Sequence, residues 1–189
     1  TNGVGIIHDF EHAFLGRSTE FVRENVETGT FGAWDETGRS IMLALAAGGL
    51  ENKGYGCSLG QFIARDGCEL PSPEKLREAI IKDPASRQAA AQADCLQLMS
   101  QFQLKPGFHA VKHRNKKASI LANAHAHGVP VSVHPGIGYD IITNHPMFKG
   151  SIVGRAAESD FELFCKAVEG LDQGSVLSVG SAIMGPQVF

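Results

Sequence analysis

The sequence begins with Thr1-Asn2-Gly3-Val4-Gly5-Ile6-Ile7-His8-Asp9-Phe10-Glu11-His12, in which a short apolar run passes into a dense group of ionisable residues. We expect residues 3–7 to form a buried strand, and residues 11–25 to form a helix that is interrupted at Gly16. Ionisable groups that follow a buried strand are typical of α/β active sites, because ligands bind at the carboxyl ends of the strands. This stretch therefore favours an enzyme or a cofactor-binding domain.

Two later apolar segments also end in polar turns. Residues 129–133 are expected to form a strand that opens into His134-Pro135-Gly136-Ile137-Gly138-Tyr139-Asp140, and residues 175–179 a strand that meets Gly180-Ser181. Residues 35–50, 85–103, 118–127 and 159–169 have helical patterns, and Gly128 is suited to cap the third of these helices. Helices that alternate with short apolar strands predict an α/β fold with a parallel sheet.

The remaining segments read as connections. Residues 51–65 are interrupted by three glycines, and residues 67–73 and 104–116 are expected to be loops. A helix is expected to begin at Ser72-Pro73-Glu74, because proline is favoured in the first helical turn. Residues 1–189 therefore form one predicted domain. Both ends fall where a further strand or helix is expected, so we expect the domain to be part of a longer chain.

The three strand ends are expected to meet in one cleft, since they would share one edge of a parallel sheet. The backbone N–H groups of Gly136, Gly138 and Gly180-Ser181 would then hold phosphates or a carboxylate, while a purely structural turn is the alternative at each position. Asp9 and Glu11 are suited to accept hydrogen bonds from the paired hydroxyls of ribose. A helix cap is the alternative role for Asp9.

The histidines supply two further hypotheses. His134 is suited to act as a general base or to orient a ligand, because histidine titrates near neutral pH, and a structural histidine is the alternative. The segment from His8 to His12 also matches the H-x-x-E-H pattern of inverted zinc proteases, with Glu11 in place to activate water. The expected strand next to His8 argues against this zinc hydrolase, and no third ligand stands out downstream.

Composition is that of a soluble globular protein, with 43% hydrophobic and 20% charged residues and a net charge of −3. The one cationic run, formed by Lys112, Arg114, Lys116 and Lys117, is better explained as a solvated loop than as a nucleic-acid site. The four cysteines lack CxxC spacing and indicate reduced thiols in the cytoplasm. No apolar stretch approaches the roughly 20 residues that span a bilayer, so no membrane partner is expected.

Several of these motifs resemble those of deoxyhypusine synthase and its relatives. The segment from Thr1 to Glu11 looks like the strand end and histidine-aspartate-x-glutamate motif of that family, and residues 14–18 resemble its next turn. Residues 129–140 are similar to its strand and glycine- and aspartate-bearing loop, and residues 175–183 to its strand and triple-glycine turn. Residues 65–117 have no counterpart that we can place. The resemblance implies a Rossmann-like parallel sheet with helices on both faces, a homotetramer, and NAD as cofactor.

The resemblance also implies roles for individual residues. The expected catalytic candidates are His134, Asp140 and His8, and the expected cofactor-binding residues are Asn2, Asp9, Glu11, Gly138, Gly180 and Ser181. The family places a lysine after its triple-glycine turn as a covalent nucleophile, whereas this chain has Ala182-Ile183-Met184-Gly185 there, and none of these residues can replace an amine. We therefore expect an NAD-binding transferase that acts on a small amine- or hydroxyl-bearing metabolite rather than a true deoxyhypusine synthase. A non-catalytic ligand-binding member of the same fold is the alternative.

Overall fold

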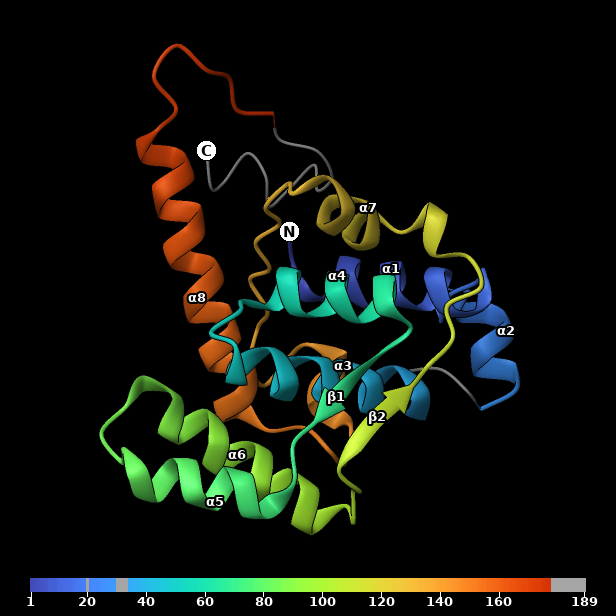
Figure 1. The fold of residues 1–189 in the computed structure, drawn as a ribbon. Helices are drawn as coiled ribbons and strands as arrows, with labels where there is room; N and C mark the ends of the chain where they lie inside the picture. Colours follow the sequence, from blue (N-terminus) through green and yellow to red (C-terminus); the bar gives the residue numbers. More distant parts are fainter. Residues whose placement is uncertain (20, 30–33, 178–189) are drawn as a thin grey trace.

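The protein is mainly helical in the computed structural model, which describes residues 1–19, 21–29 and 34–177 (Figure 1). The predicted Rossmann-like α/β fold is wrong for this part of the chain, because no parallel sheet is formed there. The elements in chain order are α1 (Gly3–Leu15), α2 (Val22–Glu27), α3 (Asp35–Leu50), α4 (Tyr55–Arg65), β1 (Gly67–Leu70), α5 (Pro73–Lys82), α6 (Arg87–Gln101), β2 (Gly107–Ala110), η1 (Lys116–Ala118), α7 (Ile120–His127), η2 (Ile141–Asn144) and α8 (Gly150–Glu169).

The sheet among the described residues has two antiparallel strands, and both come from segments that were expected to be loops. Gly67 of β1 lies opposite Ala110 of β2, and Leu70 lies opposite Gly107. Both strands begin with a glycine at positive φ, +140° and +110°, a conformation that side chains rarely allow. Leu70 is buried and joins the core, and β1 packs against α3 and α4, so the two strands lie beside the helices rather than forming a central sheet.

The amino-terminal apolar run is the first turn and a half of α1, not a strand. Asn2 caps this helix by accepting a hydrogen bond from the Gly5 N–H (3.0 Å). The buried apolar positions continue past the run to Phe10 and Ala13, with the spacing of one helix face. A helix cap and a 3.6-residue period therefore outweigh the local resemblance to a strand. The predicted interruption is confirmed, because α1 ends at Gly16 in the left-handed conformation.

The other two predicted strands are also wrong within the described residues. Residues 129–133 run as an irregular extended segment, and the nearest approach to a parallel sheet is a single bridge between Asn2 and His134. The Thr1 amino group donates to the Ser132 carbonyl (2.9 Å), and the His134 N–H donates to the Thr1 carbonyl (2.8 Å). Residues 174–177 form no strand, and residues 178 and 179 lie outside the described part of the chain.

Helix α3 is the centre of the core, where it packs against α4, α6, α8 and β1. All of its residues from Ser40 to Ala46 are buried. Figure 1 shows α1 and α4 on one side of α3, the α5–α6 pair at one end, and α8 along another side, where it extends beyond the other helices. The amino-terminal end of α4 contacts α8 directly, and the segment that follows α7 lies beside the amino-terminal end of α1.

Local sequence signals place most of the remaining helices correctly. The predicted helices over 35–50 and 85–103 are confirmed as α3 and α6, and α5 starts at Pro73 behind a Ser72 cap. Helix α7 ends at Gly128 in the left-handed conformation, as predicted. Two predictions were wrong. Helix α8 begins nine residues before residue 159, and α4 runs without a break through Gly56 and Gly60, which were expected to interrupt it.

Those glycines serve close packing and do not break the helix. A Cβ atom on Gly56 would lie 1.9 Å from the Val131 carbonyl oxygen, and one on Gly60 would lie 2.7 Å from the Leu121 carbonyl oxygen. Glycine therefore lets α4 approach the backbone of α7 and of the segment after it. This contact carries residues 131–134 toward the amino-terminal end of α4.

Candidate polar site at the amino-terminal ends of α1 and α4

The structure brings three of the predicted site residues together. Asn2 forms the parallel bridge with His134, and Gly3 packs directly on the Asp140 carboxylate, where a Cβ atom on Gly3 would lie 2.2 Å from Oδ2. Gly138 belongs to the same loop, at φ +96°, but it is exposed. The amino-terminal segment and the 134–140 loop therefore meet, although no parallel sheet brings them together.

Asp140 is a buried carboxylate at the start of α1. Its side chain is 4% exposed, and its Oδ2 accepts the Gly136 N–H at 2.6 Å. A negative charge at this position is stabilised by the dipole and the unpaired N–H groups of the helix. The Gly136 N–H, expected to bind a phosphate, is therefore already engaged by a carboxylate of the protein.

Asp160 has the same role at the start of α4, and no sequence motif indicates it. This α8 side chain is 2% exposed, and its Oδ2 accepts hydrogen bonds from the Gly56 N–H (2.9 Å) and the Val133 N–H (2.8 Å). Burial raises the pKa of Asp160, and the two backbone N–H groups, His134 and the Thr1 amino group oppose this effect. Asp160 therefore joins α8, α4 and the segment before His134.

Tyr55 is the first residue of α4 and completes the group. The residue is 0% exposed, and its hydroxyl forms no hydrogen bond with any described residue. Burial raises the pKa of Tyr55, and the carboxylates of Asp140 and Asp160 raise it further. We call Tyr55, Asp140 and Asp160 the Tyr55 cluster. The only hint of it in the sequence is a tyrosine between two glycines, Gly54 and Gly56.

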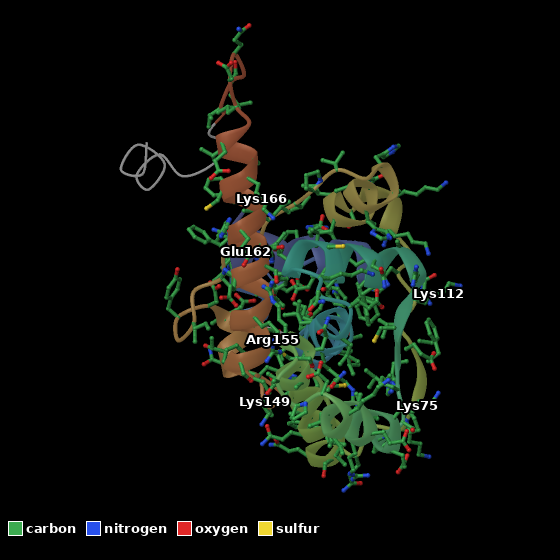
Figure 2. All side chains as sticks on the ribbon, turned by 60° about the vertical axis from the view of Figure 1, so that its left-hand side comes forward. Lys75, Lys112, Lys149, Arg155, Glu162 and Lys166 are labelled. Atoms are coloured by element: carbon green, nitrogen blue, oxygen red, sulfur yellow. The ribbon has the colours of Figure 1, made fainter. Side chains whose placement is uncertain are left out.

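The Tyr55 cluster has no cationic side chain of its own. Within the described ranges, neither Asp140 nor Asp160 forms an ion pair with lysine or arginine. Figure 2 shows Arg155 and Glu162 on α8, on either side of Asp160 in sequence. Arg155 binds Asp94 instead (2.6 Å), and Glu162 pairs with Arg87 (3.5 Å). Two buried carboxylates next to an unpaired hydroxyl are therefore left without a countercharge from these arginines.

A cavity of about 320 Å³ lies on the α8 side of the cluster and is lined by Asp160, whereas Tyr55 and Asp140 are not among its lining residues. Asp160 forms part of its wall, and the other charged residues in the lining carry both signs: Lys53, Arg87, Glu162 and Lys166. Two of the three cations are paired, Lys53 with Glu51 and Arg87 with Glu162. The cavity therefore offers both an acidic wall and cationic side chains to a polar ligand.

His134 borders the cluster through its neighbour Val133. Its ring meets the rings of Phe164 and Phe161 edge-on, with centroids 5.4 and 6.5 Å away, and its Nε2 lies 3.3 Å from the Ser132 hydroxyl. Partial burial lowers the pKa of His134, as does the Thr1 amino group, while Asp160 opposes them. His134 is therefore neutral at pH 7 and able to accept a proton.

Asp9, a predicted cofactor ligand, caps α7. Its carboxylate accepts hydrogen bonds from the Ser119 hydroxyl (2.7 Å), the Ile120 N–H (2.7 Å) and the Leu121 N–H (3.2 Å). Both oxygens are engaged at a helix amino terminus, which is the environment that stabilises a carboxylate. The cap was one of the two roles considered for Asp9, although the helix it caps is not its own.

Glu11 and His8 also belong to α1, beyond its first turn. Glu11 is 0% exposed and accepts from the Thr19 N–H (2.8 Å), the Thr19 hydroxyl and the Thr37 hydroxyl (3.1 Å). His8 Nδ1 lies 3.4 Å from Glu11 Oε2, while His12 points to solvent. Glu11 is therefore occupied inside the core, and in the described part of the chain no three histidine, cysteine or acidic residues are grouped to hold a metal ion.

Comparison with known proteins finds no matching family model, curated protein or solved structure. Gly180 and Ser181, the last two predicted cofactor-binding residues, lie outside the described residues. No helix in the described ranges has the length and apolar character needed to cross a membrane.

Proposed function

We propose that this protein binds a small amine-bearing metabolite at the Tyr55 cluster, with His134 as the acid–base group beside it. The supporting observation is the burial of Asp140 and Asp160 beside the Tyr55 hydroxyl: among the described residues the hydroxyl has no hydrogen-bond partner, and the carboxylates have backbone N–H donors but no lysine or arginine partner. Burying a charged carboxylate is costly unless a countercharge or hydrogen bonds compensate it. A ligand ammonium group supplies a positive charge and three N–H donors, which complement two carboxylates and a phenol oxygen.

The surroundings suit a ligand that is polar along its length. Lys166 and the paired cations of the 320 Å³ cavity favour hydroxyl or carboxylate groups at the end that lies away from Asp160. Partial burial lowers the pKa of His134, so at pH 7 its ring adds no positive charge that would repel the ammonium group. The ligand class is therefore an amine that also carries oxygen atoms.

The resemblance to deoxyhypusine synthase, the NAD cofactor and the homo-oligomer stay predictions. An amine ligand agrees with the resemblance, whereas three groups expected to bind the nucleotide have protein partners: Asp9, Glu11 and the Gly136 N–H. NAD therefore enters the binding experiment as a test ligand, and the proposal does not depend on it.

The test is a binding titration by calorimetry and ligand-observed NMR. Aliphatic amines and amino alcohols are compared with uncharged alcohols of the same carbon chain, and NAD is titrated separately. We expect binding of the amines only, and a loss of roughly 10- to 100-fold in affinity in Asp160→Asn and Asp140→Asn, the usual effect of losing one charge-assisted hydrogen bond. Asparagine retains an oxygen acceptor for the backbone N–H groups, so these variants are expected to fold.

Glu158→Gln is the matched control, because it removes one carboxylate from the exposed side of the same helix. Equal affinity of the wild type and both aspartate variants for every amine would contradict the proposal. So would equal binding of each amine and its matching alcohol.

A further inference from the structure

His113 is a fully buried histidine whose two ring nitrogens have no hydrogen-bond partner among the described residues. It lies just before η1, and its ring meets those of Phe10 and Phe14 in α1 and Phe62 in α4, with centroids 5.2, 6.1 and 5.8 Å away. Buried polar groups without partners are uncommon in folded proteins and call for a physical explanation. Apolar surroundings of three phenyl rings stabilise the neutral imidazole far better than the charged one.

Two charged groups act on the His113 ring. Asp66 follows α4, and its Oδ1 lies 3.5 Å from Nδ1 but accepts the backbone N–H of His113 at 2.8 Å. Lys116 comes from η1 and binds the other Asp66 oxygen at 2.7 Å. Burial lowers the pKa of His113, Lys116 adds to this effect, and Asp66 opposes it without reversing it. The Asp66 carboxylate is therefore already balanced by Lys116, and a protonated His113 would be a second, buried cation.

The segment that carries His113 also connects β2 to α7. The Val111 N–H donates to the Asp66 carbonyl (2.8 Å), and the Asn115 N–H donates to the Ala13 carbonyl at the end of α1 (2.9 Å). The segment ends at Ser119, whose hydroxyl donates to Asp9. Residues 111–119 therefore fix the start of α7 to α1 and α4, and the His113 ring is buried between these two helices.

We propose that His113 is a pH-sensitive latch: the neutral ring holds residues 111–119 against α1 and α4, and protonation releases them together with the start of α7. Because the closed state binds fewer protons than the open one, the latch is most stable above the pKa of an exposed histidine, about 6.5, and weakens as the pH falls below it. Helix α7 forms one wall of a cavity of about 260 Å³, which Leu121, Ala124 and His125 line. Acidification therefore releases the start of α7 beside this cavity while the rest of the fold stays intact.

Hydrogen exchange of the wild-type protein between pH 7.5 and 5.0 tests the latch, with rates corrected for the intrinsic pH dependence of exchange. If the closed ring stays neutral over this range, protection of residues 111–119 is expected to fall by up to about 30-fold, the linkage limit for a pKa of 6.5. Protection of α5 and α6 is expected to stay constant. A loss of equal size in α5 and α6, or no loss in residues 111–119, would overturn the proposal.

Two variants and one spectroscopic signal make the test specific. His113→Phe keeps the aromatic contacts and is expected to abolish the pH dependence in residues 111–119, whereas His12→Gln, at an exposed position of α1, is expected to retain it. The Cε1–H resonance of His113 in the wild type is expected to titrate below pH 6.5. This signal needs no variant, so the proposal is also refuted if the resonance titrates at or above 6.5.

Discussion

Replacing Asp9 with alanine distinguishes a structural carboxylate from a cofactor ligand. The carboxylate accepts hydrogen bonds from two N–H groups and one hydroxyl at the start of α7, at distances from 2.7 to 3.2 Å. Losing a helix cap costs about 0.5–2 kcal/mol, and hydrogen bonds to a charged group contribute about 1.5–3 kcal/mol each when buried. Asp9 is half-buried, and the Ser119 hydroxyl still accepts the Ala122 N–H (3.0 Å). We therefore expect Asp9→Ala to lower the free energy of unfolding by about 2 kcal/mol.

Urea denaturation at pH 7, followed by far-UV circular dichroism, measures this loss. Asp9→Asn retains one oxygen acceptor without the charge, so it should lose about half as much. His12→Ala is the control on the same helix, and it should change the free energy of unfolding by less than about 0.5 kcal/mol because the residue is exposed. An Asp9→Ala variant as stable as the wild type would contradict the capping role, and a simultaneous loss of NAD binding would return Asp9 to the cofactor role.

Three further substitutions test the packing around the site. Glu11→Gln should destabilise the protein by about 2–4 kcal/mol, because an amide group would face buried hydroxyl donors; an unchanged urea midpoint would contradict this. Tyr55→Phe should leave the ligand-free protein as stable as the wild type, or about 1 kcal/mol more stable, since it removes an unpaired buried hydroxyl; a clear loss would show that the hydroxyl has a partner in the free protein. Gly56→Ala should cost about 2–4 kcal/mol, because the new Cβ would lie 1.9 Å from a carbonyl oxygen of Val131. Gly49→Ala is its matched control inside α3, with its nearest neighbour at 3.7 Å, and thermal melts should show it about 0.5–1 kcal/mol more stable.

Sequence signals predicted the helices that begin and end with local capping residues. Ser72 and Pro73 mark the start of α5, and Gly128 marks the end of α7, because each acts on backbone groups within a few residues. The run from Gly3 to Ile7 failed as a strand because a short apolar segment fits a buried strand and a helix face equally well. The apolar positions that continue the helical period, Phe10 and Ala13, are what distinguish the two.

The candidate site could be predicted only in part, because its polar contacts join residues far apart in the chain. Asn2, His134 and Asp140 were expected to lie close together because a parallel sheet would align their strand ends. They do lie close together, but through a single bridge and the packing of Gly3 on Asp140. Asp160 binds the Gly56 N–H across 104 residues, and Asp9 binds Ser119 across 110. A carboxylate that caps a helix from another element leaves no local pattern, so acids of this kind resemble catalytic residues in sequence.

The pKa of the Asp160 carboxyl, measured by carbon-13 NMR with and without amine, tests the proposed site most directly. In the free protein this pKa is expected to lie above its ordinary value, because burial is the largest effect on it. A bound ammonium group stabilises the carboxylate, so saturation with the tightest-binding amine should lower the pKa, while the matching alcohol should leave it unchanged. A pKa of Asp160 that is the same at the highest concentration of every amine would contradict an ammonium site at the Tyr55 cluster.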